Sequence, residues 1–234
     1  MIKPYYETEL GKLYHGDCLD IIPHLPFKSK AIITDPPFAF TGGISNGSSA
    51  NTSEQFFRHW WQSVCERIAE HLEPDASGFI WCDWKTAKII SDGFEPKTQT
   101  YDFYRISQML YHFREMPGMG RPFRSSVDMI AYLRGPKHKD PDIPATTLNH
   151  ISEYWYYGKH EFHQSEKSVS MVERMLGWCS VENDMVIDPF AGSCTVAIAC
   201  EKLKRRWVCI ELEEYICAIA KQRIENERKQ RKLF

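Results

Sequence analysis

Residues 31–38, Ala-Ile-Ile-Thr-Asp-Pro-Pro-Phe, place an acid, two prolines and an aromatic ring directly after a short apolar run. Pro36 and Pro37 each fix the backbone φ angle, and Pro37 keeps Pro36 out of the helical region. The chain therefore leaves the run as a stiff turn, which holds the Asp35 carboxylate, nearby carbonyls and the Phe38 ring together. Because carboxylate and carbonyl oxygens only accept hydrogen bonds, the turn suits an amino group on a flat heterocycle. A plain strand end with a core phenylalanine is the alternative.

A second turn of small residues lies at 186–195, Val-Ile-Asp-Pro-Phe-Ala-Gly-Ser-Cys-Thr. An apolar strand, a small-residue turn and a helix let a ligand approach backbone N–H groups. Glu211 closes the next apolar run about twenty residues on, the spacing at which an acid binds ribose hydroxyls. The turn has neither G-x-G-x-x-G nor a phosphate-binding lysine, so a nucleoside cofactor without phosphates fits best. A tight turn followed by a surface glutamate is the alternative.

A sheet must hold these two turns in place. Apolar runs rich in β-branched and aromatic residues predict strands at 12–15, 31–34, 79–82, 101–113, 127–133, 185–188 and 207–210. Apolar residues at helical spacing predict helices at 53–73, 84–90, 165–180, 195–202 and from 213 onward. Strands alternating with helices favour an α/β fold, with a mostly parallel central sheet and helices on both faces.

Three further stretches bear on the site. Residues 40–52 form a long, small and polar loop after the acidic turn, either a mobile lid or a disordered spacer. We assign Trp60 and Trp61 of the 53–73 helix to the core rather than to a ligand site. The basic residues at 221–232 on the terminal helix are assigned to a solvated face.

Length and composition exclude several classes of protein. The 234 residues are 13% aromatic with a net charge of −2, which argues against a disordered chain and against a wholly basic nucleic-acid binder. Eight cysteines are scattered without a C-x-x-C pair, so we expect buried free thiols and no metal site. No stretch reaches membrane-spanning length and no signal peptide is apparent, so we expect a cytoplasmic protein.

Three motifs together resemble those of the S-adenosylmethionine-dependent DNA amino-methyltransferases. They are Asp-Pro-Pro-Phe at 35–38, His-Gln-Ser-Glu-Lys at 163–167 and Asp-Pro-Phe-Ala-Gly-Ser-Cys-Thr at 188–195. Their order, with the catalytic motif first, is similar to the β group, the adenine N6 and cytosine N4 enzymes of bacterial and phage restriction–modification type. The resemblance covers nearly the whole chain. It implies a Rossmann-like methyltransferase fold, S-adenosylmethionine (SAM) as cofactor and double-stranded DNA as substrate.

The resemblance also implies which residues form the site. The catalytic ones are Asp35, Pro36, Pro37 and Phe38. The cofactor-binding ones are Asp17, Cys18, Asp35, His163, Lys167, Asp188, Phe190, Ala191, Gly192, Ser193, Cys194, Thr195 and Glu211. Two positions depart from the family pattern: Cys194 replaces a glycine, and Phe38 stands where tyrosine is common. A cysteine would be strained if its φ were positive and would cost little if it were already helical.

The implied reaction is methylation of an amino group on a base flipped out of the duplex. Asp35 and the Pro36 carbonyl would accept the two amino hydrogens, and Phe38 would stack on the base. We expect adenine N6 as the acceptor, because family members that act on cytosine N4 more often carry serine at position 35. Cytosine N4 is the alternative.

DNA contacts are expected in the part least like a nucleotide-binding core. Between positions 99 and 139 there are seven Lys/Arg and three acids. From these we expect Arg114, Arg121, Arg124 and Lys137 to bind DNA, with Arg121 and Arg124 on phosphate or guanine. The recognition region is short, which is compatible with a short target site or with a homodimer that shares recognition. A restriction–modification enzyme would also have a cognate restriction endonuclease.

We expect one domain over 1–234, with a catalytic half at 31–98, a hairpin and target-recognition region at 99–162 and a cofactor-binding half at 163–234. Two other functions stay open. One is a non-catalytic nucleic-acid-binding module on the same fold. The other is the same chemistry on RNA or on a protein amide, although protein-amide enzymes usually carry asparagine at position 35.

Overall fold

The computed structural model describes residues 2–38, 54–94, 104–113, 122–123, 125–141, 143–144, 146–151 and 167–231. Its strands are β1 (Tyr6–Glu7), β2 (Gly11–His15), β3 (Ser29–Thr34), β4 (Leu72–Cys82), β5 (Arg105–Phe113), β6 (Val127–Arg134), β7 (His150–Ile151), β8 (Met185–Asp188) and β9 (Arg206–Glu211). Its helices are α1 (Cys18–Ile21), the 3-10 helix η1 (Ile22–His24), α2 (Glu54–His71), α3 (Ala87–Phe94), α4 (Val169–Cys179), α5 (Thr195–Leu203) and α6 (Glu214–Arg231).

All described strands join one sheet in the order β1-β2-β9-β8-β3-β4-β6-β5-β7. The pairs from β2 through β9, β8 and β3 to β4 are parallel, whereas β6 pairs antiparallel with both β4 and β5. The α/β prediction of a mostly parallel Rossmann-like sheet is confirmed. The chain crosses from β3 to β4 in one direction and from β8 to β9 in the other, so the strand order reverses between β3 and β8. In open α/β sheets this is where ligands bind, beyond the carboxyl ends of the strands.

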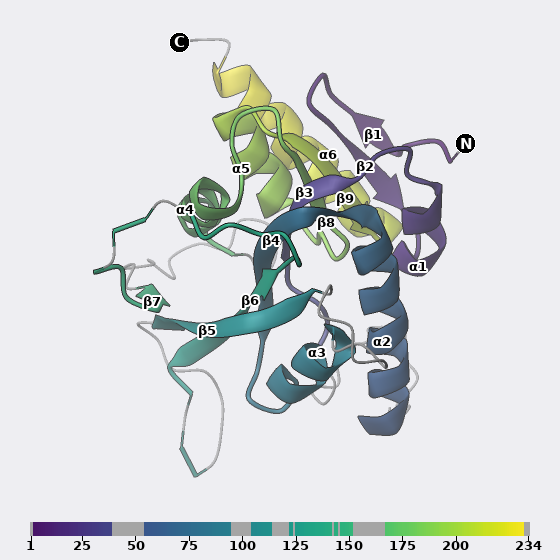
Figure 1. The fold of residues 1–234 in the computed structure, drawn as a ribbon. Helices are drawn as coiled ribbons and strands as arrows, with labels where there is room; N and C mark the ends of the chain where they lie inside the picture. The colour runs from purple at the N-terminus through teal and green to yellow at the C-terminus, as the bar shows by residue number, and fades with distance from the viewer. Residues whose placement is uncertain are drawn as a thin grey trace.

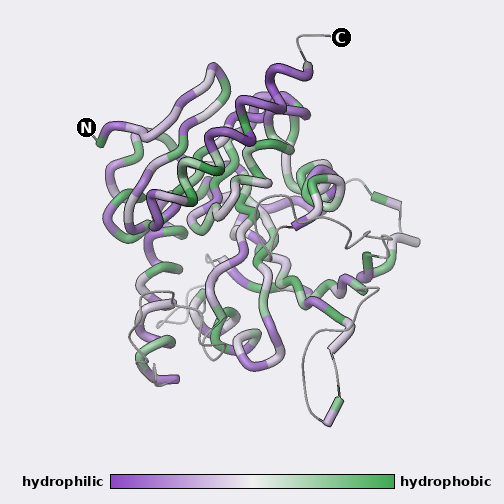
Figure 2. Tube along the Cα trace, turned by 180° about the vertical axis from the view of Figure 1, so that it is seen from behind, coloured by the Kyte–Doolittle hydropathy of each residue, from purple (hydrophilic) through white to green (hydrophobic). Residues whose placement is uncertain are grey.

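Two layers of helices enclose the sheet (Figure 1). Helices α4, α5 and α6 supply the buried side chains on one face, and α1, α2 and α3 supply them on the other. Apolar residues follow the central strands in the view from behind, and the outer turns of α6 are hydrophilic (Figure 2). All eight cysteines are buried and none forms a disulfide. In the described part of the chain, every helix is too short or too polar to span a bilayer.

The structure corrects two predicted elements. The strand predicted at 79–82 begins already at Leu72, so residues 74–78 lie inside β4; the β3–β4 register shifts between Ser29 and Ala31 and absorbs the extra residues. Gly78 is needed there, since a Cβ at this position would lie 1.9 Å from the backbone oxygen of Ile32. The helix predicted at 84–90 begins only at Ala87, because Asp83 organises a turn first.

Candidate active site

A cleft of about 440 Å³ opens at the carboxyl ends of β3, β8 and β9. Its volume is typical of sites for small molecules and cofactors. The cleft brings together most of the predicted site residues: Asp17, Cys18, Asp35, Pro37, Lys167, Asp188, Phe190, Ala191, Gly192, Ser193, Thr195 and Glu211. The acidic turn and the small-residue turn, more than 150 residues apart in the sequence, therefore line one site.

Asp35 follows β3 and forms an ion pair with Lys167, at 2.6 Å between its Oδ2 and the lysine Nζ. The Lys167 Nζ also lies 5.6 Å from the ring centroid of Trp81, a cation–π distance. The other oxygen of Asp35, Oδ1, is buried and accepts no hydrogen bond from any residue that the structure describes. A buried acceptor without a hydrogen bond lowers the stability of the fold. We therefore expect the two oxygens of this carboxylate to have different roles. Lys167 holds one, and the other is left for an N–H donor.

Asp188, at the end of β8, connects the two turns. Its Oδ1 accepts hydrogen bonds from the Thr34 hydroxyl at 2.7 Å and from the Phe190 N–H at 3.1 Å. Because Thr34 precedes Asp35 directly, this contact fixes the acidic turn against the small-residue turn. Burial, with a smaller contribution from the neighbouring carboxylates of Asp35 and Glu211, raises the pKa of Asp188 to about 7.

This pKa makes stability depend on pH. The folded protein keeps the Asp188 proton up to about pH 7, whereas the unfolded chain releases it near pH 4. The free energy of unfolding therefore falls as the pH rises from about 4 to 7, by up to about 4 kcal/mol from this group. Asp188→Asn keeps the Oδ1 acceptor and cannot ionise. We expect it to stabilise the protein at pH 8 and to leave it unchanged near pH 4, measured by chemical denaturation. A wild-type stability equal to that of the variant at both pH values would contradict the assignment.

Glu211, at the end of β9, holds the small-residue turn through its side chain. Its Oε2 accepts from the Gly192 N–H at 2.8 Å and its Oε1 from the Glu213 N–H at 2.9 Å. Its backbone carbonyl accepts from Gly16, which brings the turn after β2 to the same place. Each carboxylate oxygen has a further lone pair, so Glu211 can still accept hydrogen bonds from a ligand.

Gly192 leaves room for a ligand at the middle of the turn. Its φ is +50°, and a Cβ built there would meet no atom within 4 Å. The left-handed conformation favours glycine, and the open space lets a ligand approach the backbone. Both properties agree with the prediction that this turn contacts a cofactor.

Cys194, which replaces the family's second glycine, has φ +60° and ψ +41°. The turn therefore has a left-handed backbone conformation at this position, and a residue other than glycine is strained in that conformation. The Cys194 side chain is fully buried and its thiol hydrogen-bonds the Cys209 thiol. The strain is thus partly offset by packing beneath the turn, away from the cleft.

Two substitutions separate strain from packing at this position. Cys194→Ala and Cys194→Gly both remove the thiol, but only glycine removes the left-handed strain. We expect the glycine variant to be more stable than the alanine variant by about 1 kcal/mol. Denaturant unfolding of both variants measures the difference, and equal stability would show that the backbone is unstrained. We also expect Cys194→Gly to bind the cofactor at least as well as the wild type, measured by calorimetry.

Arg223 supports the same turn from α6. Its Nη1 donates to the Ser193 carbonyl at 2.8 Å, to the Ser193 hydroxyl at 2.7 Å and to the Thr195 hydroxyl at 3.3 Å. The residue is only 8% exposed. The assignment of the basic residues of this helix to a solvated face is therefore wrong for Arg223. No pattern in the sequence separates it from its exposed neighbours.

Some predicted residues lie elsewhere. Pro36 and Cys194 are buried next to the cleft without lining it, and Phe38 packs half-buried on the α4 side of the core. Lys137 is exposed after β6, where its N–H donates to the Pro74 carbonyl near the amino end of β4. This is the opposite end of the strands from Asp35. His163, Arg114, Arg121 and Arg124 lie outside the described residues.

The cleft also contains aromatic residues that the sequence did not single out. Trp60 lines it from α2, Trp81 from β4 and Tyr215 from the start of α6. Trp60 packs against the core, as expected, and its ring also contacts Phe190 at 5.7 Å between centroids. Five acids line the cleft: Asp17, Asp35, Asp188, Glu211 and Glu213. Among the described residues of the cleft, Lys167 is the one cation. The site therefore combines aromatic and other apolar side chains with an excess of acids.

The chain matches known proteins over most of its length. A family model for N6/N4 DNA methylases matches residues 29–222. The type II methyltransferase M.BamHI of Bacillus amyloliquefaciens is 27% identical over 265 residues, which cover 100% of this chain and 61% of that protein. The type II methyltransferase M2.LlaDCHI of Lactococcus lactis subsp. cremoris is 27% identical, over 97% of this chain and 93% of that protein.

Two solved structures have a similar fold. The M1.HpyAVI–SAM complex superposes with a TM-score of 0.69 at 21% identity, over 92% of this chain and 99% of that one. The cytosine-N4-specific PvuII DNA methyltransferase gives a TM-score of 0.73 at 18% identity, over 98% and 95%. At these identities the likeness establishes the fold. The chain spans about three-fifths of M.BamHI and nearly all of the other three proteins.

Proposed function

Because this chain belongs to the N6/N4 DNA methylase family, we propose that it transfers a methyl group from SAM to N6 of adenine in double-stranded DNA. The observation that carries the proposal is the Asp35 carboxylate. Lys167 holds its Oδ2, and its buried Oδ1 has no hydrogen-bond partner within the described part of the chain. An acceptor kept in this way beside a cofactor-sized cleft suits an amino group that becomes positively charged as it reacts.

The residues of the cleft fit SAM. The acidic lining suits a ligand with a sulfonium and an ammonium group, and Glu211 has lone pairs left for ribose hydroxyls. Gly192 leaves open space against its backbone. Phe190 and Trp60 offer flat apolar surfaces for a purine. The cleft offers no cluster of cations for a pyrophosphate among its described residues, which agrees with a cofactor without phosphates.

When bound, SAM supplies a methyl group on a positively charged sulfur. Asp35 Oδ1 accepts one hydrogen of the amino group, and the Pro36 carbonyl accepts the other. These two acceptors favour the pyramidal, positively charged nitrogen over the flat amino group of the free base. Lys167 fixes the carboxylate, so its orientation is set before the base arrives. After transfer the nitrogen is acidic, and Asp35 can take its proton at Oδ1. Phe38 stacks on the flipped base.

Adenine is favoured over cytosine by the acid at position 35. Cytosine N4 presents the same amino group beside a ring nitrogen, so it is the alternative acceptor for the same machinery. We assign target recognition to the 99–162 region. Its described strands β5 and β6 extend the sheet beyond β4, on the side of the acidic turn rather than of the cofactor turn.

Methyl transfer to unmethylated genomic DNA tests the proposal. The protein is incubated with SAM labelled in its methyl group, and the DNA is digested to nucleosides. We expect the label in N6-methyladenine, and a matched RNA should accept none. Label in N4-methylcytosine would overturn the base assignment, and label in RNA alone would overturn the substrate. No transfer together with no SAM binding would favour the non-catalytic module.

A further inference from the structure

Trp84 is an exposed residue at the carboxyl ends of β3 and β4, the end of the sheet that carries the acidic turn. Its side chain is 76% exposed, whereas the other described tryptophans are buried or half-buried. It comes two residues after the end of β4, the direct neighbour of β3. Thr34 pairs with Ile80, so the turn that follows Cys82 and the turn that holds Asp35 leave the same end of two neighbouring strands. Trp84 is therefore placed at the same end of the sheet as the catalytic turn, and it does not line the cleft.

Trp84 lies in a turn that several hydrogen bonds hold in place. The Asp83 Oδ1 accepts from the Lys85 N–H at 3.0 Å, the Thr86 N–H at 2.7 Å and the Thr86 hydroxyl at 2.8 Å. The Asp83 N–H in turn donates to the Thr86 hydroxyl at 3.0 Å, and Thr86 is fully buried. These four hydrogen bonds fix the backbone on both sides of the tryptophan, so it is presented to solvent by a rigid element.

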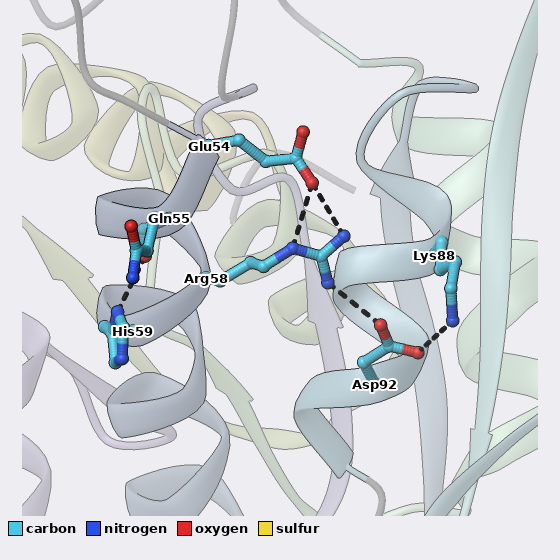
Figure 3. Close-up of polar contacts among 6 residues, drawn as sticks. All are labelled: Glu54, Gln55, Arg58, His59, Lys88 and Asp92. Carbon is cyan, nitrogen blue, oxygen red and sulfur yellow. Dashed lines mark hydrogen bonds and ion pairs between the residues drawn. The ribbon is translucent and has the colours of Figure 1, made fainter.

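Helix α3, which follows this turn, is joined to α2 by one ion pair, and each helix carries a further ion pair of its own (Figure 3). Arg58 on α2 contacts Asp92 on α3 at 2.9 Å and Glu54 of its own helix at 2.8 Å. Lys88 contacts the other Asp92 oxygen at 2.8 Å. Because α2 also carries Trp60 into the cleft, the turn that holds Trp84 keeps a fixed position relative to the site.

Lys85 gives this element its positive charge. The Lys85 Nζ lies 5.6 Å from the ring centroid of Trp84, and both side chains are exposed. Two further aromatic rings follow along the same edge. Phe113, at the end of β5, is 49% exposed, and Phe123, in the connection from β5 to β6, is 87% exposed. An aromatic surface with an adjacent cation is the combination that binds unstacked bases and their phosphates.

We propose that Trp84 and Lys85 form a DNA contact beside the reacting nucleotide, with the indole stacked on a base of the opened duplex and the ammonium on a phosphate. The inference rests on the proposed function, because flipping one nucleotide unstacks its neighbours and exposes a base face next to the catalytic turn. The contact needs no particular base, since every base has a flat face. It therefore supplies affinity for opened DNA and leaves sequence recognition to the 99–162 region.

Four variants and two matched controls test this contact on fragments of unmethylated phage DNA. We expect Trp84→Ala to lower kcat/KM for DNA by about tenfold to a hundredfold, with SAM affinity unchanged. Trp84→Phe should keep most of the wild-type kcat/KM for DNA because it keeps a flat ring. Lys85→Ala should weaken DNA binding and reduce the slope of log affinity against log salt by about one, and Lys85→Arg should keep that slope.

The controls are an exposed lysine beside an aromatic ring and an exposed apolar residue, and neither of them lines the cleft. Lys221→Ala removes an exposed lysine 5.7 Å from the Tyr6 ring, at the edge strand β1. Val181→Ala removes a side chain that is 67% exposed, just before the amino end of β8. Both should behave as the wild type.

The outcomes separate this inference from the proposed function. A Trp84→Ala variant that methylates DNA as well as the wild type would overturn the contact and leave the function intact. A wild type that transfers no methyl group but binds DNA more tightly than Trp84→Ala would overturn the function and keep the contact. A wild type without transfer, and without any difference from Trp84→Ala in DNA affinity, would overturn both.

Discussion

Asp35→Ala is expected to lower kcat for methyl transfer at least a thousandfold while the dissociation constant for SAM changes less than about threefold. The reason is that Asp35 acts on the amino group as its charge develops, and one preorganised group of this kind contributes about a hundredfold to a thousandfold. Removing it also leaves the Lys167 ammonium at the acceptor position, which opposes a positive nitrogen. Single-turnover rates at saturating SAM and calorimetric SAM titration measure the two quantities separately.

A matched control is available on the same pair of strands. Asp75 on β4 forms an ion pair with Lys30 on β3, near the amino end of the strands. Asp75→Ala therefore removes an aspartate from a comparable acid–lysine pair at the other end of the sheet, and its kcat should equal that of the wild type. If Asp35→Ala lost SAM binding and activity to the same degree, Asp35 would be a folding residue rather than a catalytic one.

Glu211→Ala is expected to raise the dissociation constant for SAM about a hundredfold and to leave kcat at saturating SAM within a few-fold of the wild type. Hydrogen bonds to a charged group contribute about 1.5–3 kcal/mol each, and two ribose hydroxyls at the lower end of this range, about 3 kcal/mol together, correspond to about a hundredfold. The substitution also removes the acceptor of the Gly192 N–H, which loosens the turn that the cofactor contacts.

Two further variants sharpen the result for Glu211. Glu211→Gln keeps an acceptor oxygen without the charge and should lose affinity by about tenfold. Glu214→Ala removes an exposed acid from the first turn of α6, outside the cleft, and should bind SAM normally. A Glu211→Ala variant with wild-type SAM affinity would place the ribose elsewhere.

The local chemistry of the site could be predicted from the sequence because each motif is continuous. Asp35 to Phe38 and Asp188 to Thr195 carry their turn geometry in adjacent residues, and Glu211 ends a recognisable apolar strand. The contact between them depends on strand order. β3 and β8 become neighbours through the packing of the whole sheet, which periodicity does not report. The family resemblance supplied that long-range information.

The residues that the sequence missed depend on tertiary contacts or on capping. Arg223 resembles its exposed neighbours on α6 until the Ser193 carbonyl provides an acceptor for it. Trp84 fits a helical pattern, but Asp83 and Thr86 satisfy each other's backbone and delay the helix to Ala87. Side chains of this type compete with the helix for backbone groups. Trp60 sits on a helix whose apolar stripe predicts a core residue; it does pack against the core, and it also lines the cleft next to Phe190.

If the turns after β3 and β8 form one site for methyl transfer, SAM already bound to the protein should react when DNA arrives. Isotope partitioning tests it most directly. The protein is first saturated with methyl-labelled SAM, then mixed with unmethylated genomic DNA and a large excess of unlabelled SAM, and the DNA is collected after one turnover. We expect label in N6-methyladenine from the wild type and none from Asp35→Ala, although both bind SAM. Bound label that never reaches wild-type DNA would contradict it.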